Sequence, residues 1–593
     1  MDKNKKILNR LFPFLNWVGE LKDIKILRAD ILAGITLSLV LIPQSMANAQ
    51  LADLPPYYGF YASFVPIMVG ALFGSSRQLS TGPVALVALM TAAVLGPLAG
   101  SEEEYIGLAI MLALLVGLFQ FGLGLLRLGT LVNFLSHPVV LGFTNAAAII
   151  ISTSQIDKLF GVTVARGGPH YERMWRMWET ISVGFHTPTL VMGVSGIVVL
   201  IVLRRISQKI PNVLVVALSS TVIAWWIGFE EYYGGLVVGN IPEGIPSFAL
   251  PIIDWGMLPR MLSATITISL IGYMETISIA KAIATQTRQR IDANQELLAQ
   301  GLSNIAGSFF RSFPVSGSFV RSAVTLRAGG QTGFASVVAG VVVILMLLFF
   351  TPMLYHMPLA ILAAIVMVSV TSLLHISPIK RAWQVHRHDG IVAVATFVLT
   401  LISAPHLDVG IAVGVGLSLG LYLYRTMKPR VAVLSRHPDG ALRDAEVHKL
   451  DACEIMAMVR FDGSLYFGST GAFEDTMLTC AAQNPHLRYL IIDAEGINQV
   501  DATGEEMLLG LVRRLKEAKV EVFFGRAKKQ VLDALERPGT LDEIGRERFF
   551  ATPDQAMQAV WAKLDGSFSC HHQCPGKCPL HRATPKGAVF YRV

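Results

Sequence analysis

A short polar stretch inside a long apolar region carries the residues best suited to bind a ligand. It covers residues 312–330 and contains two arginines, one proline, three glycines and several hydroxyl groups. The part from Gly317 to Gly329 is too short and too polar to be a complete membrane span, which needs about 20 apolar residues. We therefore predict a half-helix that begins within the bilayer, capped by Ser316 or Ser318. Its free N–H groups, with Arg321 one turn further along, would suit an anion.

A similar element lies far upstream. Thr81, Gly82 and Pro83 precede a short apolar helix, and proline is favourable in a first helical turn. Aligned with Ser316–Ser318, this stretch gives a weak internal match, with one copy in each half of the hydrophobic region. Paired, interrupted, short segments at corresponding positions are typical of secondary transporters built from inverted repeats.

Glu275 lies deep within an apolar segment predicted at residues 257–284. An ionised carboxylate at that depth costs several kcal/mol unless it is paired or protonated. One interpretation is a fixed ion pair with Arg321. The other is a titratable group that takes up a proton when an anion is bound, because desolvation and a nearby cation act on it in opposite directions. We favour the second interpretation.

Two amide side chains in the first predicted span also belong to the candidate site. Gln44 and Asn48 would be costly in hydrocarbon, so they are expected to face a polar interior or to bond to neighbouring helices. We expect Pro43 to break the helix beside Gln44, which favours a site role for that residue. For Arg321, the alternative to a site role is a side chain that extends to the lipid headgroups.

Composition places the chain among polytopic membrane proteins. Its 593 residues are 53% hydrophobic and only 15% charged, which excludes a single soluble domain. The net charge of +7 does not indicate nucleic-acid binding, because basic residues collect in loops expected to face the cytoplasm. The basic N-terminus lacks the apolar core of a signal peptide, and the five cysteines lie outside the spans and predict no extracellular disulfide framework.

Hydropathy predicts roughly fourteen segments, and the positive-inside rule places both termini in the cytoplasm. The loop at 158–187 should be external yet contains three arginines, and its Trp175 and Trp178 indicate an interfacial segment. The segments are predicted at 28–52, 57–74, 80–96, 105–127, 135–157, 188–206, 211–229, 257–284, 296–310, 318–328, 331–350, 358–374, 388–403 and 406–425.

The polar region after the last span predicts a small α/β domain. Strand patterns occur at Glu454–Phe461, Arg488–Ile492 and Val520–Phe524, with helical spacing between them. The predicted organisation is a cytoplasmic N-terminal segment at 1–27, a transmembrane domain at 28–425, a linker at 426–449, the α/β domain at 450–565 and a tail at 566–593.

These motifs resemble the sulfate permease (SulP) family of anion transporters over nearly the whole chain. The resemblance implies a fold of seven plus seven inverted segments, a core domain that moves against a gate domain, and a homodimer. It also implies that the third and tenth segments are half-helices and that the α/β domain is a STAS domain. The motifs that carry it are Asp30–Gly34, Ile42–Ala47, Leu54–Tyr61, Ser75–Arg77, Glu275–Ala280 and Gly317–Ala323.

The resemblance also implies roles for individual residues. Gln44 and Asn48 would line the pocket and Glu275 would couple transport to a driving ion. The two amide clusters around the anion would come from Thr81, Gly82, Pro83, Val84 and Ala85, and from Gly317, Ser318, Phe319, Val320 and Arg321. The sequence departs from the family where Asn48 replaces an aromatic residue and Val320 replaces a serine, which leaves the identity of the anion open.

Two further motifs lie outside the membrane. The turn Asp501–Gly504 resembles a STAS phosphorylation site, with Thr503 as its hydroxyl, but capping of the following helix is the favoured interpretation. In the tail, three thiols and a histidine could bind zinc, although a disordered, reducible tail is favoured over a metal site. These ligands would be Cys570, Cys574, Cys578 and His581.

The resulting hypothesis is a proton-coupled importer of sulfate or a related oxyanion, located in the cell membrane and working by alternating access. The alternatives are sodium-coupled uptake of bicarbonate or a dicarboxylate, and an anion sensor that signals to a cytosolic partner through the STAS domain. No enzyme is expected, because the sequence contains no nucleophile and base set, and no cofactor or nucleic-acid partner is expected.

Overall fold

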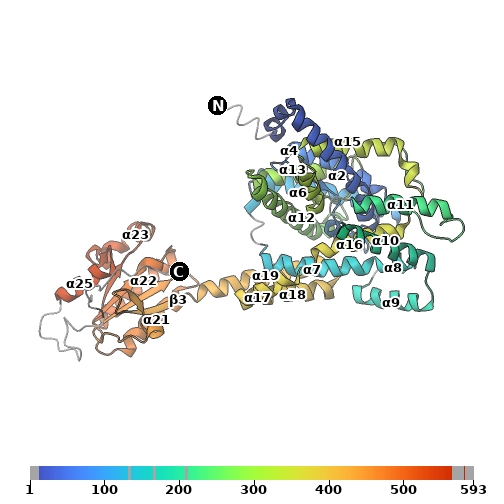
Figure 1. The fold of residues 1–593 in the computed structure, drawn as a ribbon. Helices are drawn as coiled ribbons and strands as arrows, with labels where there is room; N and C mark the ends of the chain where they lie inside the picture. Colours follow the sequence, from blue (N-terminus) through green and yellow to red (C-terminus); the bar gives the residue numbers. More distant parts are fainter. Residues whose placement is uncertain (1–11, 131–134, 165–167, 207–210, 564–579, 581–593) are drawn as a thin grey trace. The chain divides into compact units, whose positions relative to one another are not determined.

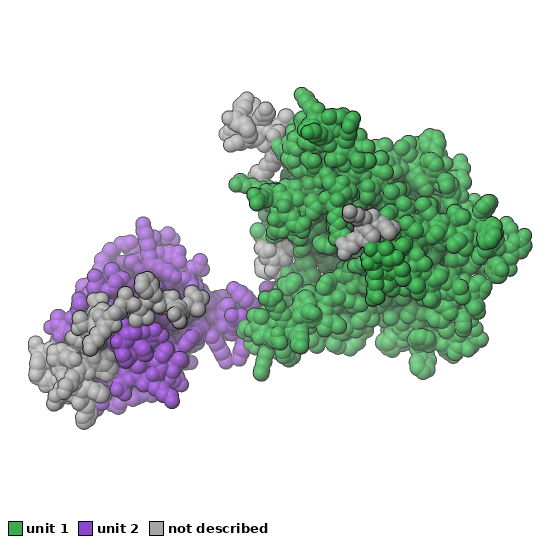
Figure 2. Space-filling view, viewed as in Figure 1, with its two compact units in different colours: residues 1–418 green, residues 419–593 purple. Residues whose placement is uncertain are grey.

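The structure is a computed structural model that describes residues 12–130, 135–164, 168–206, 211–563 and 580. The chain divides into two compact units, residues 1–418 and 419–593, shown in different colours in Figure 2. Among the described residues, seven helices are long and apolar enough to cross a membrane, and four shorter apolar helices accompany them. The prediction of a polytopic helical membrane protein followed by an α/β domain is confirmed.

Most predicted segments form helices within a few residues of the expected bounds (Figure 1). The longest are α2 (Ile24–Leu51) and α12 (Leu258–Thr287). The others are α3 (Tyr58–Tyr61), α4 (Val65–Phe73), α5 (Ala85–Leu95), α6 (Glu102–Leu125), α7 (His137–Ser154), α8 (Ile156–Phe160), α10 (Thr187–Ile206), α11 (Asn212–Ile227), α13 (Ala293–Ser308), α14 (Phe319–Arg327), α15 (Phe334–Phe349), α16 (Leu359–Val370), α18 (Arg387–Ser403) and α19 (Leu407–Met427).

The predicted break at Pro43 is wrong, because α2 remains helical on both sides of this residue. A proline inside a helix removes one N–H donor and leaves the carbonyl four residues earlier without its partner. Neighbouring helices can compensate for that loss within a membrane. The half of α2 that follows Pro43 is buried throughout, so packing holds the helix together.

The helices of the first unit pack in two groups. The first group contains α2 to α6 and α12 to α15, and α13 packs against both α6 and α4. Glycines allow that close approach, since a Cβ atom on Gly301 would lie 2.5 Å from the Phe121 nitrogen, and one on Gly117 would lie 2.7 Å from the Ile305 nitrogen. The second group is built around α7, α10, α16 and α18, and α16 packs against α2 of the first group.

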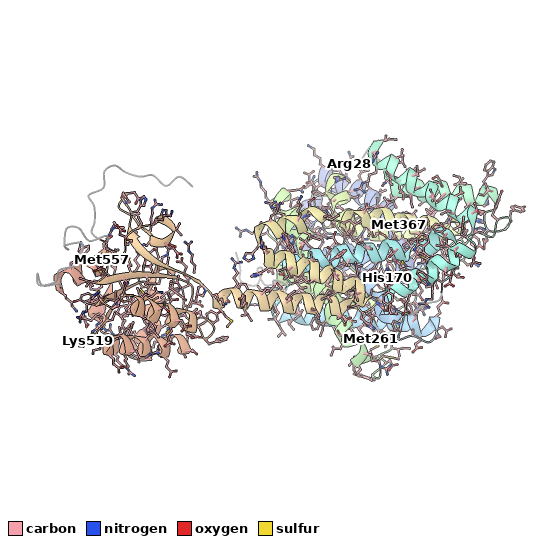
Figure 3. The ribbon with its side chains drawn as sticks, turned by 90° about the horizontal axis from the view of Figure 1, so that it is seen from below. Arg28, His170, Met261, Met367, Lys519 and Met557 are labelled. Atoms are coloured by element: carbon pink, nitrogen blue, oxygen red, sulfur yellow. The ribbon has the colours of Figure 1, made fainter. Side chains whose placement is uncertain are left out.

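Two short amphipathic helices were not predicted as elements. The first is α9 (His170–Val183), within the loop expected to be interfacial, where Trp175 and Trp178 are 75% and 55% exposed. The side chain of its first residue, His170, is labelled in Figure 3 and lies 3.0 Å from the Thr153 hydroxyl. The second is α17 (Ile376–Val385), which follows α16 after the short 3-10 helix η5 (Thr371–Leu373).

The second unit contains a six-stranded sheet in the order β4-β3-β5-β6-β7-β8. Strands β5 to β8 run parallel, and β3 pairs antiparallel with both β4 and β5. Helices α21 (Thr470–Gln483), α22 (Ala502–Glu517) and α25 (Pro553–Lys563) pack against these strands or against one another. In chain order, the strands are β3 (Arg430–Arg436), β4 (Leu442–Asp444), β5 (Met456–Asp462), β6 (Tyr489–Asp493), β7 (Glu521–Gly525) and β8 (Phe549–Phe550).

The prediction that residues 426–449 form a linker is wrong. Its residues form β3 and β4, which belong to the sheet. Strand β3 pairs with β5 through contacts such as Val431 with Phe461 and Val433 with Val459. That pairing joins segments about 30 residues apart, so local sequence around a short strand contains little sign of it.

Candidate functional site

Two strands of two residues each join the halves of the transmembrane unit. Strand β1 (Thr81–Gly82) pairs antiparallel with β2 (Ser316–Gly317), so that Thr81 lies opposite Gly317. The amide of Ser318 also donates to the carbonyl of Ser80 at 2.9 Å. Non-helical backbone at membrane depth is tolerated when protein satisfies its hydrogen bonds, and this pairing does so.

A half-helix begins directly after each strand. Helix α5 starts at Ala85 and its N-cap residue, Val84, has no polar side-chain atom with which to cap it. Helix α14 starts at Phe319, and its N-cap residue Ser318 accepts one bond, from the Arg321 amide at 3.5 Å. Because the first N–H groups of a helix have no partner within the helix, both N-termini present donors and partial positive charge.

Both N-termini line the same cavity, which has a volume of about 70 Å³. Helix α2 contributes three residues to its wall, α12 contributes one, and the opposite wall comes from α16 and η5; Met367 marks α16 in Figure 3. The lining residues are Gln44, Ala47, Asn48, Val84, Ala85, Leu86, Glu275, Ser318, Phe319, Val320, Ile365, Val366, Ser369, Val370, Ser372 and Leu373.

Arg321 lies behind the strands and is fully buried. Its Nη1 donates to the carbonyl of Pro83 at 2.6 Å, and its Nε lies 3.4 Å from the Ser80 hydroxyl. Its Nη2 has no hydrogen-bond partner among the described residues. The side chain therefore does not extend toward headgroups: it places a full positive charge beside the N-terminus of α5 and holds the loop that leads into that helix.

Glu275 lines the cavity, and its Oε2 has no hydrogen-bond partner within the described part of the chain. Across the same residues, no ion pair within 4 Å joins Glu275 to Arg321, although the two charges interact electrostatically. A fixed ion pair is therefore not what the geometry shows. A carboxylate whose oxygen is buried without a partner is costly when ionised, which favours a bound proton, whereas the positive charge around the cavity favours the ionised form until an anion neutralises that charge.

The two amides of α2 occupy different environments. The Nδ2 of Asn48 donates to the Pro83 carbonyl at 2.9 Å, so that carbonyl receives donors from both Asn48 and Arg321. The Oε1 of Gln44 is buried and has no partner among the described residues. Because both residues line the cavity, Gln44 is free to bond to a ligand while Asn48 fixes the loop.

The other predicted site residues support the cavity from behind. The Thr81 hydroxyl accepts a bond from Gln300 Nε2 at 2.8 Å, and Gly82, Pro83 and Gly317 are absent from the lining. Two of these positions leave little room for a side chain: a Cβ atom on Gly82 would lie 3.1 Å from Arg321 Nη2. One on Gly317 would lie 2.9 Å from the Thr276 hydroxyl.

Sequence reasoning missed the polar residues that hold β2 in place. Asn304 on α13 accepts from the Val315 amide at 2.8 Å and donates to the Val315 carbonyl at 3.1 Å. On α12, the Thr276 hydroxyl accepts from the Gly317 amide at 3.0 Å. One signal could have found Asn304: it lies four residues after Gln300 in an apolar segment, so both side chains share one helical face.

The opposite wall of the cavity was also missed. Ser369 and Ser372 are its only hydroxyl-bearing residues, and the remaining lining residues of α16 and η5 are apolar. Their sequence predicts a membrane span and carries no sign of which face meets the half-helices, because hydropathy does not report tertiary contacts.

In the second unit, Asp501 caps α22 by accepting from the Gly504 amide at 2.7 Å, and its other oxygen accepts from the Phe467 amide. Thr503 is exposed in the first turn of that helix. Burial raises the pKa of Asp493, a residue that is 2% exposed at the end of β6. The candidate zinc ligands Cys570, Cys574, Cys578 and His581 lie outside the described residues.

Comparison with known proteins agrees with this architecture. The chain is 33% identical over 581 residues to sulfate transporter 4.1, chloroplastic, of Arabidopsis thaliana, covering 94% of this chain and 84% of the relative. It is 28% identical over 583 residues to high affinity sulfate transporter 2 of Stylosanthes hamata, covering 94% and 87%. Both similarities extend through the membrane unit and the domain that follows it.

Solved structures share the fold. The murine solute carrier 26 family member A9 anion transporter, in an inward-facing state, superposes with a TM-score of 0.88 at 23% identity, covering 95% of this chain and 96% of that chain. The transmembrane domain of the cyanobacterial bicarbonate transporter BicA gives 0.57 at 21% identity, covering 66% and 97%. The model of the sulfate permease family matches residues 27–396, and that of the STAS domain matches residues 445–556. This chain therefore belongs to the sulfate permease family of anion transporters, which are not enzymes, and it carries a STAS domain after its last membrane helix.

Proposed function

We propose that the protein imports sulfate or a closely related oxyanion together with a proton. The observation that carries this proposal is the convergence of two half-helix N-termini and the unpartnered Glu275 on one cavity. Amide N–H groups and helix N-termini bind oxyanions without a metal. The relatives named as sulfate transporters support the choice of anion.

Charge balance favours a dianion with a proton. Each helix N-terminus contributes roughly half a positive charge, so α5, α14 and Arg321 together supply roughly two positive charges. An ionised Glu275 would cancel about half of that charge, whereas a protonated Glu275 leaves it available to a sulfate dianion. Binding of the anion and of the proton would then favour one another, which is the coupling that symport requires. A monovalent anion such as bicarbonate needs no such protonation.

Two features of the cavity support alternating access. At one end it meets exposed residues, including Ser372 and Phe319, so an anion can enter from that side. At the C-terminal end of α2, Lys158 Nζ of α8 donates to the Gln50 carbonyl at 2.8 Å. The Nε2 of Gln50 in turn donates to the Leu359 carbonyl at 3.4 Å. We propose that transport breaks this closure while the α16 wall moves relative to the half-helices.

The proposed orientation of the protein in the membrane is based on the positions of its basic residues. Exposed Lys380 and Arg381 lie on α17, which closely follows the cavity-lining residues of η5, so by the positive-inside rule the accessible side would face the cytoplasm, with both termini. The protein would act in the cell membrane as a homodimer. Thr503 is an exposed candidate for phosphorylation, and a cytosolic partner of the STAS domain would read its state.

Uptake of labelled sulfate into liposomes that contain only this protein tests the function. An imposed inward proton gradient is expected to drive accumulation, whereas a sodium gradient is not. Excess bicarbonate or succinate should compete weakly. Sodium-driven uptake, or stronger competition by bicarbonate than by unlabelled sulfate, would favour the alternative substrates, and binding without uptake would favour a sensor.

A further inference from the structure

Helix α17 (Ile376–Val385) presents an exposed surface outside the cavity lining. Lys380 and Arg381 are exposed on it, and its sequence contains no acidic residue. Beside these charges, Ile376 is 78% exposed, Val385 is 74% exposed and Trp383 is 46% exposed. Exposed apolar side chains next to basic ones are typical of a helix that lies in the interface of a membrane rather than in water.

The position of α17 in the chain restricts it to the membrane surface. It lies between α16 and α18, which coincide with the segments predicted at 358–374 and 388–403, separated from the first by residues 371–375 and from the second by His386 alone. Linkers this short keep α17 at the level where both neighbours reach the bilayer surface. The helix packs against α18 and α7, and a Cβ atom on Gly390 would lie 2.4 Å from Trp383 Cε3, so one face is held by protein.

The basic side chains of this region form no ion pair with any residue that the structure describes. Within the described residues, none of the ion pairs involves Lys380, Arg381 or the nearby Arg387. Basic residues at a bilayer surface attract anionic headgroups, and tryptophan prefers the boundary between headgroups and acyl chains. The chemistry of the surface therefore fits anionic phospholipid.

The chain connects this surface directly to the cavity. Buried Asn145 on α7 makes two hydrogen bonds to His375, the residue before α17. Its Oδ1 accepts from the His375 amide at 2.8 Å, and its Nδ2 donates to the His375 carbonyl at 3.3 Å. Ser372 and Leu373, three and two residues before His375, line the cavity. Whatever positions α17 therefore also positions part of the cavity wall.

We infer that α17 is a binding surface for anionic phospholipid headgroups in the adjacent leaflet, and that this binding positions η5 for transport. Lys380 and Arg381 bind the headgroup phosphates, and Ile376 and Trp383, seven residues apart on one face of the helix, insert beside the acyl chains. The inference rests on the proposed function only for its effect on transport, because lipid binding is measured independently.

Fluorescence quenching in vesicles measures the contact. The full chain is reconstituted into phosphatidylcholine vesicles in which bromine-labelled acyl chains are carried either by phosphatidylglycerol or by phosphatidylcholine. The signal of Trp383 is the difference between the parent and a Trp383→Phe variant. Brominated phosphatidylglycerol is expected to quench Trp383 more strongly, and the variant K380Q/R381Q is expected to lose most of that preference. Each basic group near an anionic surface strengthens association roughly five-fold, so the loss should be on the order of ten-fold or more.

Two control variants make the result specific. R204Q/R205Q removes the same charge from exposed residues at the end of α10 and should leave the preference intact. The conservative K380R/R381K should retain it as well. Equal quenching by both lipids, or the same loss in R204Q/R205Q, would overturn the inference. Absence of quenching would show that protein covers α17, which would also overturn it.

Transport supplies the second readout. Labelled sulfate uptake by the parent chain should be faster with phosphatidylglycerol than with phosphatidylcholine alone, whereas K380Q/R381Q should transport at the same rate in both. A preserved quenching preference with no sulfate transport in any vesicle would contradict the proposed function and leave the lipid site standing. Equal quenching by both lipids with intact sulfate transport would contradict the lipid site and leave the proposed function standing.

Discussion

Arg321 and Asn48 donate to the same acceptor, the carbonyl oxygen of Pro83, at 2.6 and 2.9 Å. One donor comes from α14 in the second half of the membrane unit and the other from α2 in the first half. The carbonyl belongs to the loop that leads into α5, so the two side chains together fix the position of that helix's N-terminus. This arrangement separates the residues that hold the site from those that face the anion.

Replacing Arg321 with alanine is expected to weaken sulfate binding about 10- to 100-fold. The substitution removes a buried charge and one of the two donors to Pro83, and a hydrogen bond that involves a charged group contributes roughly 1.5–3 kcal/mol. Equilibrium binding of labelled sulfate to the purified protein measures the change. Arg327→Ala, at an exposed position on the same helix, should leave the Kd unaltered. An unchanged Kd in the Arg321 variant would remove that residue from the site.

Replacing Glu275 with glutamine is expected to preserve sulfate binding and to abolish accumulation driven by a proton gradient. Glutamine keeps the size of the side chain but cannot take up a proton. Uptake by the parent should therefore rise as the external pH falls, while uptake by the variant should not respond to pH. The exposed Glu103→Gln variant on α6 serves as the control. Concentrative uptake by Glu275→Gln at the rate of the parent would rule out the coupling role.

Asn304 is expected to be essential although it lies outside the cavity lining. Asn304→Leu leaves the buried amide and carbonyl of Val315 without partners, at a cost of roughly 1–3 kcal/mol for each unsatisfied group. We expect a lower Tm and weaker sulfate binding, measured by thermal unfolding and by ligand binding. Ser303→Ala is the control, since the one bond of the Ser303 hydroxyl to a described residue goes to the carbonyl of Ala299 in its own helix. Similar effects of the two substitutions would contradict a positioning role.

The wall formed by α16 can be tested by chemical labelling. A Ser369→Cys variant, with the five native cysteines replaced by serine, should react with a thiol reagent, and sulfate should protect it. At a sulfate concentration equal to the Kd, the labelling rate should fall by about half, as competition for one site requires. A cysteine at exposed Thr371, outside the cavity lining, should react without protection. Equal labelling of Ser369→Cys with and without sulfate would place the anion elsewhere.

The contribution of the turn between β3 and β4 to the stability of the second unit should depend on pH. The Ala441 amide, followed by Arg443 and His437, lowers the pKa of Asp439 from 3.8 to about 2. A lowered pKa in the folded state stabilises the fold above the ordinary value, and that contribution is lost as the pH falls toward 2. The urea midpoint of the second unit, followed by the fluorescence of Trp561, should fall over this range in the parent and less in Asp439→Asn. Asp475→Asn, an exposed change on α21, should follow the parent.

Local sequence was sufficient to predict the half-helices. Gly317 and Ser318 before a short polar helix, and Gly82 and Pro83 before a short apolar one, are signals read within a few residues, because capping and turn preferences act over that range. The same holds for the long apolar helices, whose bounds follow from hydropathy. Pro43 shows the limit of such rules, since packing keeps α2 helical where local preference favours a break.

The sequence by itself determined the class of the protein, the approximate bounds of most of its apolar helices, and the two interruptions that form the site. Only the tertiary structure decided how these parts combine: that β1 and β2 pair, that Arg321 lies behind them on Pro83 instead of in the cavity, and that α16 supplies the opposite wall. The physical reason is the range of the interactions involved. Capping and hydropathy are properties of adjacent residues, whereas these contacts join residues more than two hundred positions apart, whose meeting depends on the packing of every helix between them.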